Sequence, residues 1–265
     1  MSVRVYSGPH DIRGRGPSSS ARVLPWLLAF GVIGLEIAYP LVEGRARDAV
    51  TVATVLVFFL ATVAHALVWR GFWWTFAYTV VTVGGGLAVE AVGLRTTYPF
   101  GSYEYADSLG PKVFDVPIVI PLAWAMMAYP ALLVARRLAK GRFWTPVIAA
   151  WALASWDLFL DPMMVADGHW RWNGEFITLP GIDNVPVSNY LAWFISAFVM
   201  MLILDRLDRR RGEDGPPYVL YLWTYVSSVV ANAFFFHRPE VAIAGGVAMG
   251  LVVLPFVVKL WAGRP

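Results

Sequence analysis

The sequence predicts an all-α, polytopic integral membrane helix bundle of about eight transmembrane helices, with seven as the alternative. Hydrophobic residues make up 58% of the 265 residues and charged residues only 15%, whereas soluble domains carry about 25% charged residues. The hydrophobic residues gather in blocks of about 20, the length that crosses a bilayer core of about 30 Å. Lys and Arg cluster in the connections on one side of these blocks. Together these observations exclude a single soluble domain.

The N-terminal residues 1–21 are polar and rich in Gly, Pro, Ser and Arg, which predicts a disordered cytoplasmic tail. Residues 22–265 are expected to form a single transmembrane domain. Its predicted spans are the apolar blocks 22–43, 50–69, 72–93, 116–135, 144–160, 187–205, 217–236 and 240–261. Only the stretch His237-Arg-Pro-Glu240 separates the last two, so the seven-helix alternative arises at this boundary.

The distribution of positive charge predicts the orientation of the spans. With the N-terminus inside, 15 of the 21 Lys and Arg residues lie in inner segments, in agreement with the positive-inside rule. The two long loops, 94–115 and 161–186, then lie outside. We therefore expect a multi-pass protein of the plasma membrane with both termini in the cytoplasm. Because the cations flank spans, the net charge of +3 does not indicate a nucleic-acid partner.

Two segments of the chain resemble each other, and each contains an acid, an aromatic loop and a following helix. The matched pairs, 67 residues apart in the first part and 69 apart after a short insertion, are Glu90/Asp157, Tyr103/Trp170, Tyr105/Trp172 and Trp124/Trp193. Both segments start with an outward-running helix, so we predict a parallel internal repeat with units at about 84–135 and 151–204. Glu90 and Asp157 should then face each other near the outer ends of their helices. Convergence of two membrane loops is the alternative.

Acidic side chains within the predicted spans are candidates for catalysis, because an ionisable group in a bilayer is costly. Asp157 and Asp161 are four residues apart, which places them on one face of a helix. Two carboxyl groups that close cannot both ionise easily, so one should stay protonated and serve as a general acid. We expect Glu90, Asp157 and Asp161 to be catalytic. Alternatively, Asp161 only ends its helix before Pro162 and Asp157 is structural, while Glu36 could face the same cavity or form a contact between helices.

The aromatic residues of the loops are spaced to cover such a site. The Tyr-x-Tyr and Trp-x-Trp spacings put both rings of a pair on one face of an extended segment. Such a face could cover the acids, and aromatic faces stabilise a nearby cation. The interfacial aromatic belt is the alternative for each ring. The residues expected to bind substrate are Tyr103, Tyr105, Trp124, Trp170, Trp172, Asn189 and Trp193.

The sequence predicts neither a metal nor another cofactor. The four histidines are scattered, there is no cysteine, and no Asp-rich diphosphate motif is present. The run Gly84-Gly85-Gly86 lies within a span, so it predicts close helix packing rather than a phosphate loop.

Several motifs resemble the membrane carotenoid-biosynthesis family, which contains the carotenoid 1,2-hydratases of the bisanhydrobacterioruberin and γ-carotene types. The motifs are Glu90-Ala-Val-Gly93, Tyr98-Pro-Phe-Gly-Ser-Tyr103, Pro121-Leu-Ala-Trp124, Trp156-Asp157, Gly168-His-Trp170 and Asn189-Tyr-Leu-Ala-Trp193. The resemblance covers about residues 55–205. It implies a hydro-lyase that adds water across a terminal isoprenoid C=C of a long polyene. A long-chain carotenoid and membrane lipid are then the expected partners, and other carotenoid-pathway enzymes are further candidates.

The acids fit this chemistry without a cofactor. A protonated carboxyl would donate a proton to the alkene, and a carboxylate would take a proton from water that attacks the tertiary carbocation. We expect Glu90 in one of these roles and Asp157 or Asp161 in the other. The alternatives are cyclisation or isomerisation of the same substrate class, or a role in proton-coupled transport or lipid binding.

Overall fold

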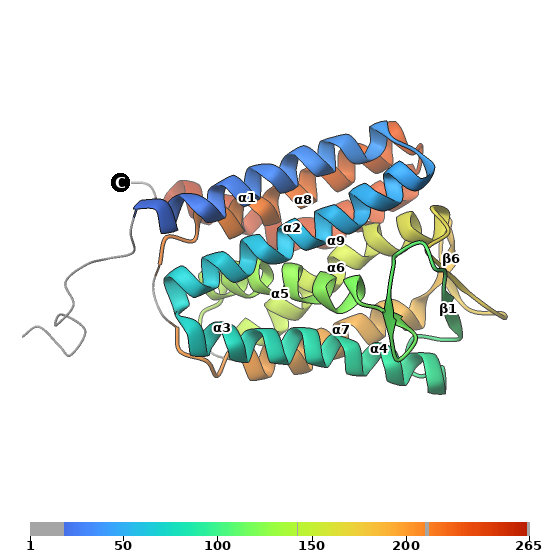
Figure 1. The fold of residues 1–265 in the computed structure, drawn as a ribbon, viewed down its shortest axis with the longest axis horizontal. Coiled ribbons are helices and arrows are strands. Elements are labelled where there is room, and N and C mark those ends of the chain that lie inside the picture. The colour runs from blue at the N-terminus through green and yellow to red at the C-terminus, as the bar shows by residue number, and fades with distance from the viewer. Residues whose placement is uncertain (1–18, 142, 210–211, 264–265) are drawn as a thin grey trace, which may run out of the picture.

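The computed structural model describes residues 19–141, 143–209 and 212–263 (Figure 1). Within these residues, eight helical spans are long and apolar enough to cross a membrane. The protein is therefore a multi-pass membrane helix bundle, and the predicted fold class is confirmed. The N-terminal tail expected over residues 1–21 lies outside the described residues, apart from its last three residues, which begin the first helix.

Five spans are single α-helices: α2 (Gly44–Arg70), α5 (Val119–Leu138), α6 (Trp144–Ala166), α7 (Val187–Leu204) and α9 (Pro239–Ala262). The other three contain a short 3-10 or π segment: α1 (Ser19–Ala38) with η2 (Tyr39–Leu41), α3 (Phe72–Thr79) with η3 (Val80–Gly84) and α4 (Gly85–Thr96), and α8 (Gly215–Val230) with η4 (Ala231–Phe235). The π segments η3 and η4 widen their helices locally, and such bulges are frequent at functional sites.

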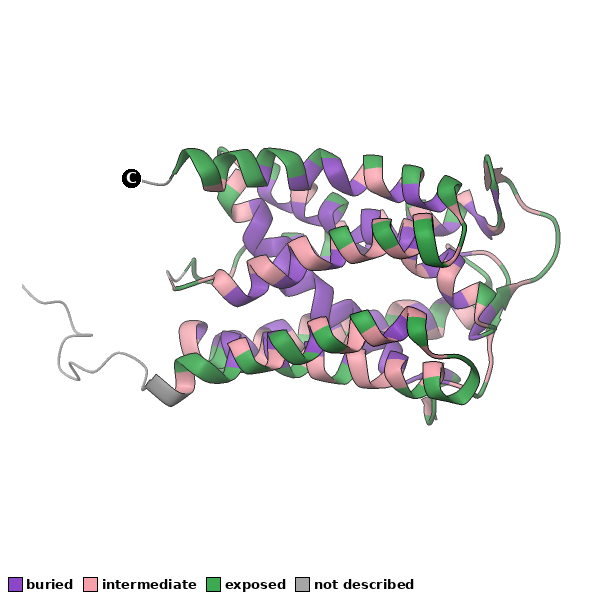
Figure 2. Ribbon diagram, turned by 90° about the horizontal axis from the view of Figure 1, so that it is seen from above, coloured by how far each residue is buried: buried purple, intermediate pink, exposed green. Residues whose placement is uncertain are grey.

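Helices α5 and α6 form the centre of the bundle. In the most apolar window of α5, 83% of the residues are buried inside the protein, against 61% for α6 and at most 44% for the other spans. Figure 2 shows the buried residues running through the middle of the bundle, with exposed residues on the outer helices. A helix that is apolar on all sides can occupy this central position. Most side chains on α5 and α6 are therefore positioned by contacts with neighbouring helices.

The glycine run in the third span packs closely against its neighbours, as predicted. A Cβ atom on Gly86 would lie 3.1 Å from the Trp124 ring, and one on Gly85 would lie 3.2 Å from Met200. Gly84 faces open space. The absence of side chains at Gly85 and Gly86 thus allows α5 and α7 to approach this span.

Both long loops lie at one end of the bundle, and short strands join them (Figure 1). The strands are β1 (Tyr103–Tyr105), β2 (Lys112–Val113), β3 (Val116–Pro117), β4 (Trp170–Trp172), β5 (Thr178–Leu179) and β6 (Ile182–Pro186). Strand β1 pairs with β4 in antiparallel register, whereas β2–β3 and β5–β6 are pairs within a loop. The β1–β4 ribbon therefore ties the first loop to the second.

Residues that the predicted repeat matches meet each other at this ribbon and below it. Glu104 lies opposite Arg171, 67 residues further along the chain. Trp124 on α5 stacks on Trp193 on α7. A two-fold relation between the two segments would produce such contacts. The duplication of the sequence itself remains a prediction.

Helix α6 continues past its predicted end at residue 160 and finishes at Ala166. Pro162 therefore lies inside the helix, although it cannot donate a backbone hydrogen bond there. In membrane helices, neighbouring helices compensate for such a break, which explains why the proline does not terminate α6. The alternative that Asp161 only ends its helix is thereby wrong, and Asp161 lies one turn after Asp157 inside the bundle.

The end of the bundle opposite the loops is held by buried ion pairs. Arg70 pairs with Asp214, and Asp205 accepts hydrogen bonds from Arg136 at 3.2 Å and from Arg209 at 2.9 Å. Both ends of the described chain also lie there (Figure 1). The loops thus cover one end of the bundle, and these ion pairs lie at the other.

Candidate active site

A small cavity of about 30 Å³ lies at the β1–β4 ribbon, among the loop ends of the central helices. Its walls combine acids, an amide, aromatic rings and aliphatic side chains: Glu90, Tyr103, Tyr105, Ile120, Ala123, Leu160, Asp161, Trp170, Trp172, Asn189 and Trp193. We call this cavity the acid pocket. Its walls include eight of the ten residues that the sequence singled out for a site. The other two, Asp157 and Trp124, hydrogen-bond to residues of the wall.

Glu90 on α4 is held by three hydrogen-bond donors. Its Oε2 accepts from the hydroxyl of Tyr103 at 2.6 Å and from that of Tyr105 at 2.9 Å, and its Oε1 accepts from Trp124 Nε1 at 3.1 Å. The residue is 4% exposed. Both carboxyl oxygens therefore accept hydrogen bonds, as a buried acidic group requires.

Gly93, one turn after Glu90, permits this arrangement. A Cβ atom at this position would lie 2.7 Å from the Phe100 ring and 3.1 Å from the Tyr103 hydroxyl oxygen. A side chain there would force the Phe100 ring to shift and would crowd the Tyr103 hydroxyl that holds Glu90. The Glu-x-x-Gly spacing thus makes room for the donor that holds the acid.

Asp157 and Asp161 share a single donor, the side-chain amide of Asn189 on α7. Asn189 Nδ2 donates to Asp157 Oδ2 at 2.9 Å and also to Asp161 Oδ2. All three residues are at most 3% exposed. Asp157 Oδ1 and the neighbouring hydroxyl of Tyr190 are buried and have no hydrogen-bond partner among the described residues. The pair therefore shares Asn189 between two acids, with Trp170 as a further side-chain hydrogen-bond partner of Asp161, whereas three donors meet at the single carboxyl of Glu90.

The β1–β4 ribbon covers the acid pocket with aromatic rings. Its register places Tyr103 opposite Trp172 and Tyr105 opposite Trp170, with ring centroids 5.9 Å and 5.7 Å apart. The predicted extended segments with both rings on one face are therefore present. Burial, and then the charge of the Glu90 carboxyl, raise the pKa of Tyr103 and of Tyr105 well above the usual value. Both tyrosines thus remain hydrogen-bond donors at neutral pH.

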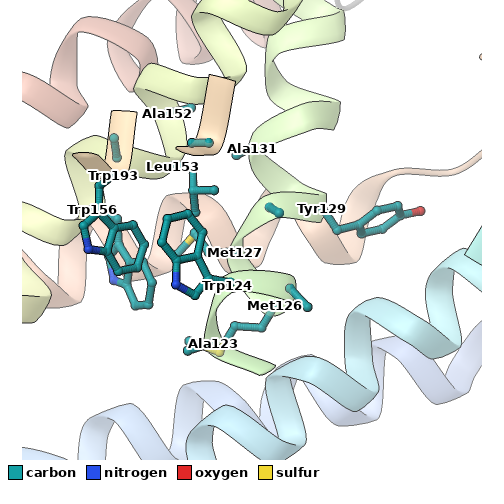
Figure 3. Packing of buried hydrophobic residues seen from close by; sticks show 14 of the residues in the cluster. Ala123, Trp124, Met126, Met127, Tyr129, Ala131, Ala152, Leu153, Trp156 and Trp193 are labelled. Atoms are coloured by element: carbon teal, nitrogen blue, oxygen red, sulfur yellow. The ribbon is translucent and has the colours of Figure 1, made fainter. Parts of the chain in front are cut away.

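Three tryptophans pack behind the acids. Trp124 and Trp193 stack with ring centroids 3.8 Å apart and planes inclined by 9°, and Trp156 contacts Trp193 edge-on at 6.4 Å (Figure 3). The stack holds the Trp124 indole so that its N–H meets Glu90. Trp193 lines the pocket, whereas Trp124 acts on it through Glu90.

A larger apolar cavity of about 120 Å³ adjoins the acid pocket. It is lined by α1, α2, α5, α6 and α8, together with Leu109 and Trp170 of the loops, and we call it the apolar chamber. The two cavities share the side chains of Ile120, Ala123, Leu160 and Trp170. A hydrocarbon in the chamber would therefore be separated from the acid pocket, with Glu90 and Asp161, by the thickness of one side chain.

Sequence reasoning missed the apolar chamber and the buried hydroxyl of Tyr190. Tyr190 directly follows Asn189 in a run that the repeat comparison matched, and this adjacency was a usable signal. The chamber left no signal, because its walls come from five apolar helices. Glu36 on α1 lines the chamber and accepts a hydrogen bond from Ser227 on α8, so of its two predicted roles the contact between helices is present and the cavity of the other acids is not.

Comparison with known proteins assigns the chain to a family. Residues 50–255 match the model of a family described as carotenoid biosynthesis protein. A relative named bisanhydrobacterioruberin hydratase, from Haloarcula japonica, is 30% identical over 185 residues, which are 66% of this chain and 59% of the relative. The chain thus spans less than two thirds of that relative's length. No solved structure matches this chain. Because the family model covers most of the chain, including every residue of the acid pocket, the chain belongs to the carotenoid biosynthesis protein family.

Proposed function

We propose that this protein is a carotenoid-modifying membrane enzyme that adds water across a terminal isoprenoid C=C of a long polyene. The observation that carries the proposal is the wall shared by the acid pocket and the apolar chamber. Proton donors and acceptors there lie against a space suited to hydrocarbon. Membership of the family and the name of the relative support the same substrate class.

The Asp157–Asp161 pair is the proposed source of the proton. Ionising both of two carboxyl groups that share one amide donor in a buried site is costly, so in the resting site they hold at least one proton between them. Asp161 lines the acid pocket and Asp157 does not. Asp161 is therefore the proposed proton donor, and Asp157 the group that keeps it protonated.

Glu90 is the proposed base. An ionised carboxylate only accepts hydrogen bonds, and three donors converge on Glu90. Its negative charge faces the pocket, where it would stabilise a carbocation and then take a proton from the attacking water. The proposed difference in protonation between Glu90 and Asp161 rests on their hydrogen-bond donors, since three donors meet at Glu90 whereas Asn189 is shared by two aspartates.

In the proposed reaction, Asp161 transfers its proton to the terminal alkene carbon and leaves a tertiary carbocation on the adjacent carbon. Water adds its oxygen to the cation while Glu90 accepts one of its protons, and the product is a tertiary alcohol. Return of this proton from Glu90 to the aspartate pair restores the site. The net reaction therefore converts the alkene and one water into the tertiary alcohol. The faces of Tyr105, Trp170 and Trp172 stabilise the cation. A cavity of about 30 Å³ has room for a water molecule.

The test is mass analysis of the carotenoids in a host that makes acyclic carotenoids and expresses this protein. We expect new pigments heavier than the substrate by one water, or by two waters if both ends react. Unchanged mass with altered absorption would contradict hydration and indicate cyclisation or isomerisation. Unchanged pigments, with folded protein and substrate present, would contradict an enzymatic role on these carotenoids and favour transport or lipid binding.

The orientation of the bundle is also proposed from charge: the aromatic loop end faces outward across the plasma membrane, and both termini face the cytoplasm. The chain has no cysteine, so single cysteines can report the two ends. We expect Ser102→Cys to react with a membrane-impermeant maleimide in intact cells. Lys140→Cys, at the opposite end, should react only after permeabilisation. Labelling of both positions from the same side, or in the reverse order, would contradict the proposed orientation.

A further inference from the structure

The apolar chamber carries a polar group of its own, away from the acid pocket. Glu36 on α1 accepts a hydrogen bond from the Ser227 hydroxyl on α8 at 2.8 Å. Both side chains line the chamber, and Glu36 is the only charged residue among the described residues that do so. An ionisable side chain within a span needs a reason, and the proposed hydration does not use this one.

Thr224, one turn before Ser227, supplies a second observation, and its hydroxyl lies close to the same Glu36 carboxyl. It lines the chamber, is 4% exposed, and its hydroxyl has no hydrogen-bond partner among the described residues. Thr51 and Thr54 on α2, which line the same chamber, instead donate to their own helix at 2.9 Å and 2.8 Å. Thr224 thus departs from the usual behaviour of threonine in a helix. A buried hydroxyl without a protein partner is available to a polar group of a ligand.

A ligand hydroxyl would complement these groups. It can accept a hydrogen bond from Thr224 and donate one to the Glu36 carboxyl, which has acceptor capacity beyond its bond to Ser227. A hydrocarbon of the same shape would satisfy neither group. The remaining lining of the chamber is predominantly aliphatic, aromatic or methionine side chains, so the rest of the ligand must be apolar.

We propose that Glu36, Thr224 and Ser227 form a hydroxyl-recognition site, so that the chamber binds an isoprenoid chain bearing a hydroxyl more tightly than the matching hydrocarbon. The isoprenoid nature of the ligand rests on the proposed function; the recognition of a hydroxyl rests on the chamber alone. A ligand held in this way extends toward Ile120, Ala123 and Leu160, the wall shared with the acid pocket. The site would therefore select isoprenoids that already carry an oxygen.

The test compares the affinities of the purified full-length protein in detergent for geraniol and for the hydrocarbon that differs only by loss of the hydroxyl. The preference is the ratio of the affinity for the alcohol to the affinity for the hydrocarbon. We expect this ratio to be about tenfold larger for the wild type than for Thr224→Val. Comparing the preference of two proteins removes the different partitioning of the two probes into detergent. Thr224→Val should melt no lower than the wild type, because it removes an unpaired buried hydroxyl. Glu36→Gln should reduce the preference in part, since its amide keeps an acceptor but loses the charge.

Thr54→Val is the matched control, since its hydroxyl lines the same chamber but is bound to its own backbone. It should keep the preference of the wild type. Equal preference in the wild type and Thr224→Val, or an equal loss in Thr54→Val, would overturn the proposal. Failure of the wild type to bind either probe would overturn it as well.

The outcome is separable from that of the proposed function. A retained alcohol preference without any gain of water by a polyene would overturn hydration and leave the hydroxyl-recognition site. Gain of water by a polyene without an alcohol preference would support hydration and overturn the hydroxyl-recognition site.

Discussion

Glu90→Gln is expected to lower the rate of alkene hydration by about 10²- to 10⁴-fold, the usual contribution of a general base. Glutamine cannot take the proton from water and carries no charge to stabilise the cation. Its amide NH₂ would also face at least one of the three donors that now bind the Glu90 carboxyl, so at least one of these hydrogen bonds would be lost. The measurement is the initial rate of formation of the hydrated product by purified protein, determined by mass spectrometry.

Glu104→Gln is a suitable control for this experiment. Glu104 lies between the two tyrosines that hold Glu90, but its side chain is exposed and pairs with Arg171 instead. An exposed ion pair contributes little to stability, so activity should remain within about twofold of the wild type. Full activity of Glu90→Gln, or equal losses in the two variants, would show that Glu90 is not the base.

Asp161→Asn is expected to have a similarly large effect, about 10²-fold or more, because asparagine has no acidic proton to give to the alkene. Asp157→Asn should be less damaging. Asp157 does not line the acid pocket, and its replacement leaves an acid in contact with the cavity. Initial rates with saturating substrate, set beside melting temperatures, distinguish loss of chemistry from loss of folding.

Asp183→Asn serves as the matched control for these two variants, since Asp183 is an exposed acid of the same loop end. It should leave the rate unchanged. A larger loss in Asp157→Asn than in Asp161→Asn, at equal melting temperature, would reverse the two proposed roles. Wild-type rates in both variants would exclude the aspartate pair from the reaction.

Much of the acid pocket could be anticipated from local patterns. Tyr103 and Tyr105 alternate along an extended segment, and this alternation alone predicts that both rings share one face. Asp157 and Asp161 are one turn apart on a helix, which predicts that they interact. The matched positions of Glu90 and Asp157 led to the expectation of one shared site. The first two arguments succeed because they depend on distances along the chain that secondary structure converts directly into geometry, whereas the shared site stays a prediction.

Other features depended on contacts between helices. Proline normally ends a helix, so the chain was expected to leave the membrane at residue 160, whereas packing within the bundle carries α6 on to Ala166. The apolar chamber is built from five helices, and no segment of the sequence contains enough of it to be recognised. Glu36 was considered with the other acids, but the placement of α1 gives it Ser227 as a partner.

The sequence by itself determined the membrane fold, the number of spans and the pairing of aromatic residues with acids, because bilayer thickness and strand alternation leave local periodic marks. Only the tertiary structure decided which acid reaches the cavity and which donors hold Glu90. It also decided that an apolar chamber adjoins the acid pocket. The physical reason is that lipid and the bundle interior are both apolar. The pattern of a membrane helix therefore does not reveal which of its faces turns inward, and the packing of neighbouring helices decides it.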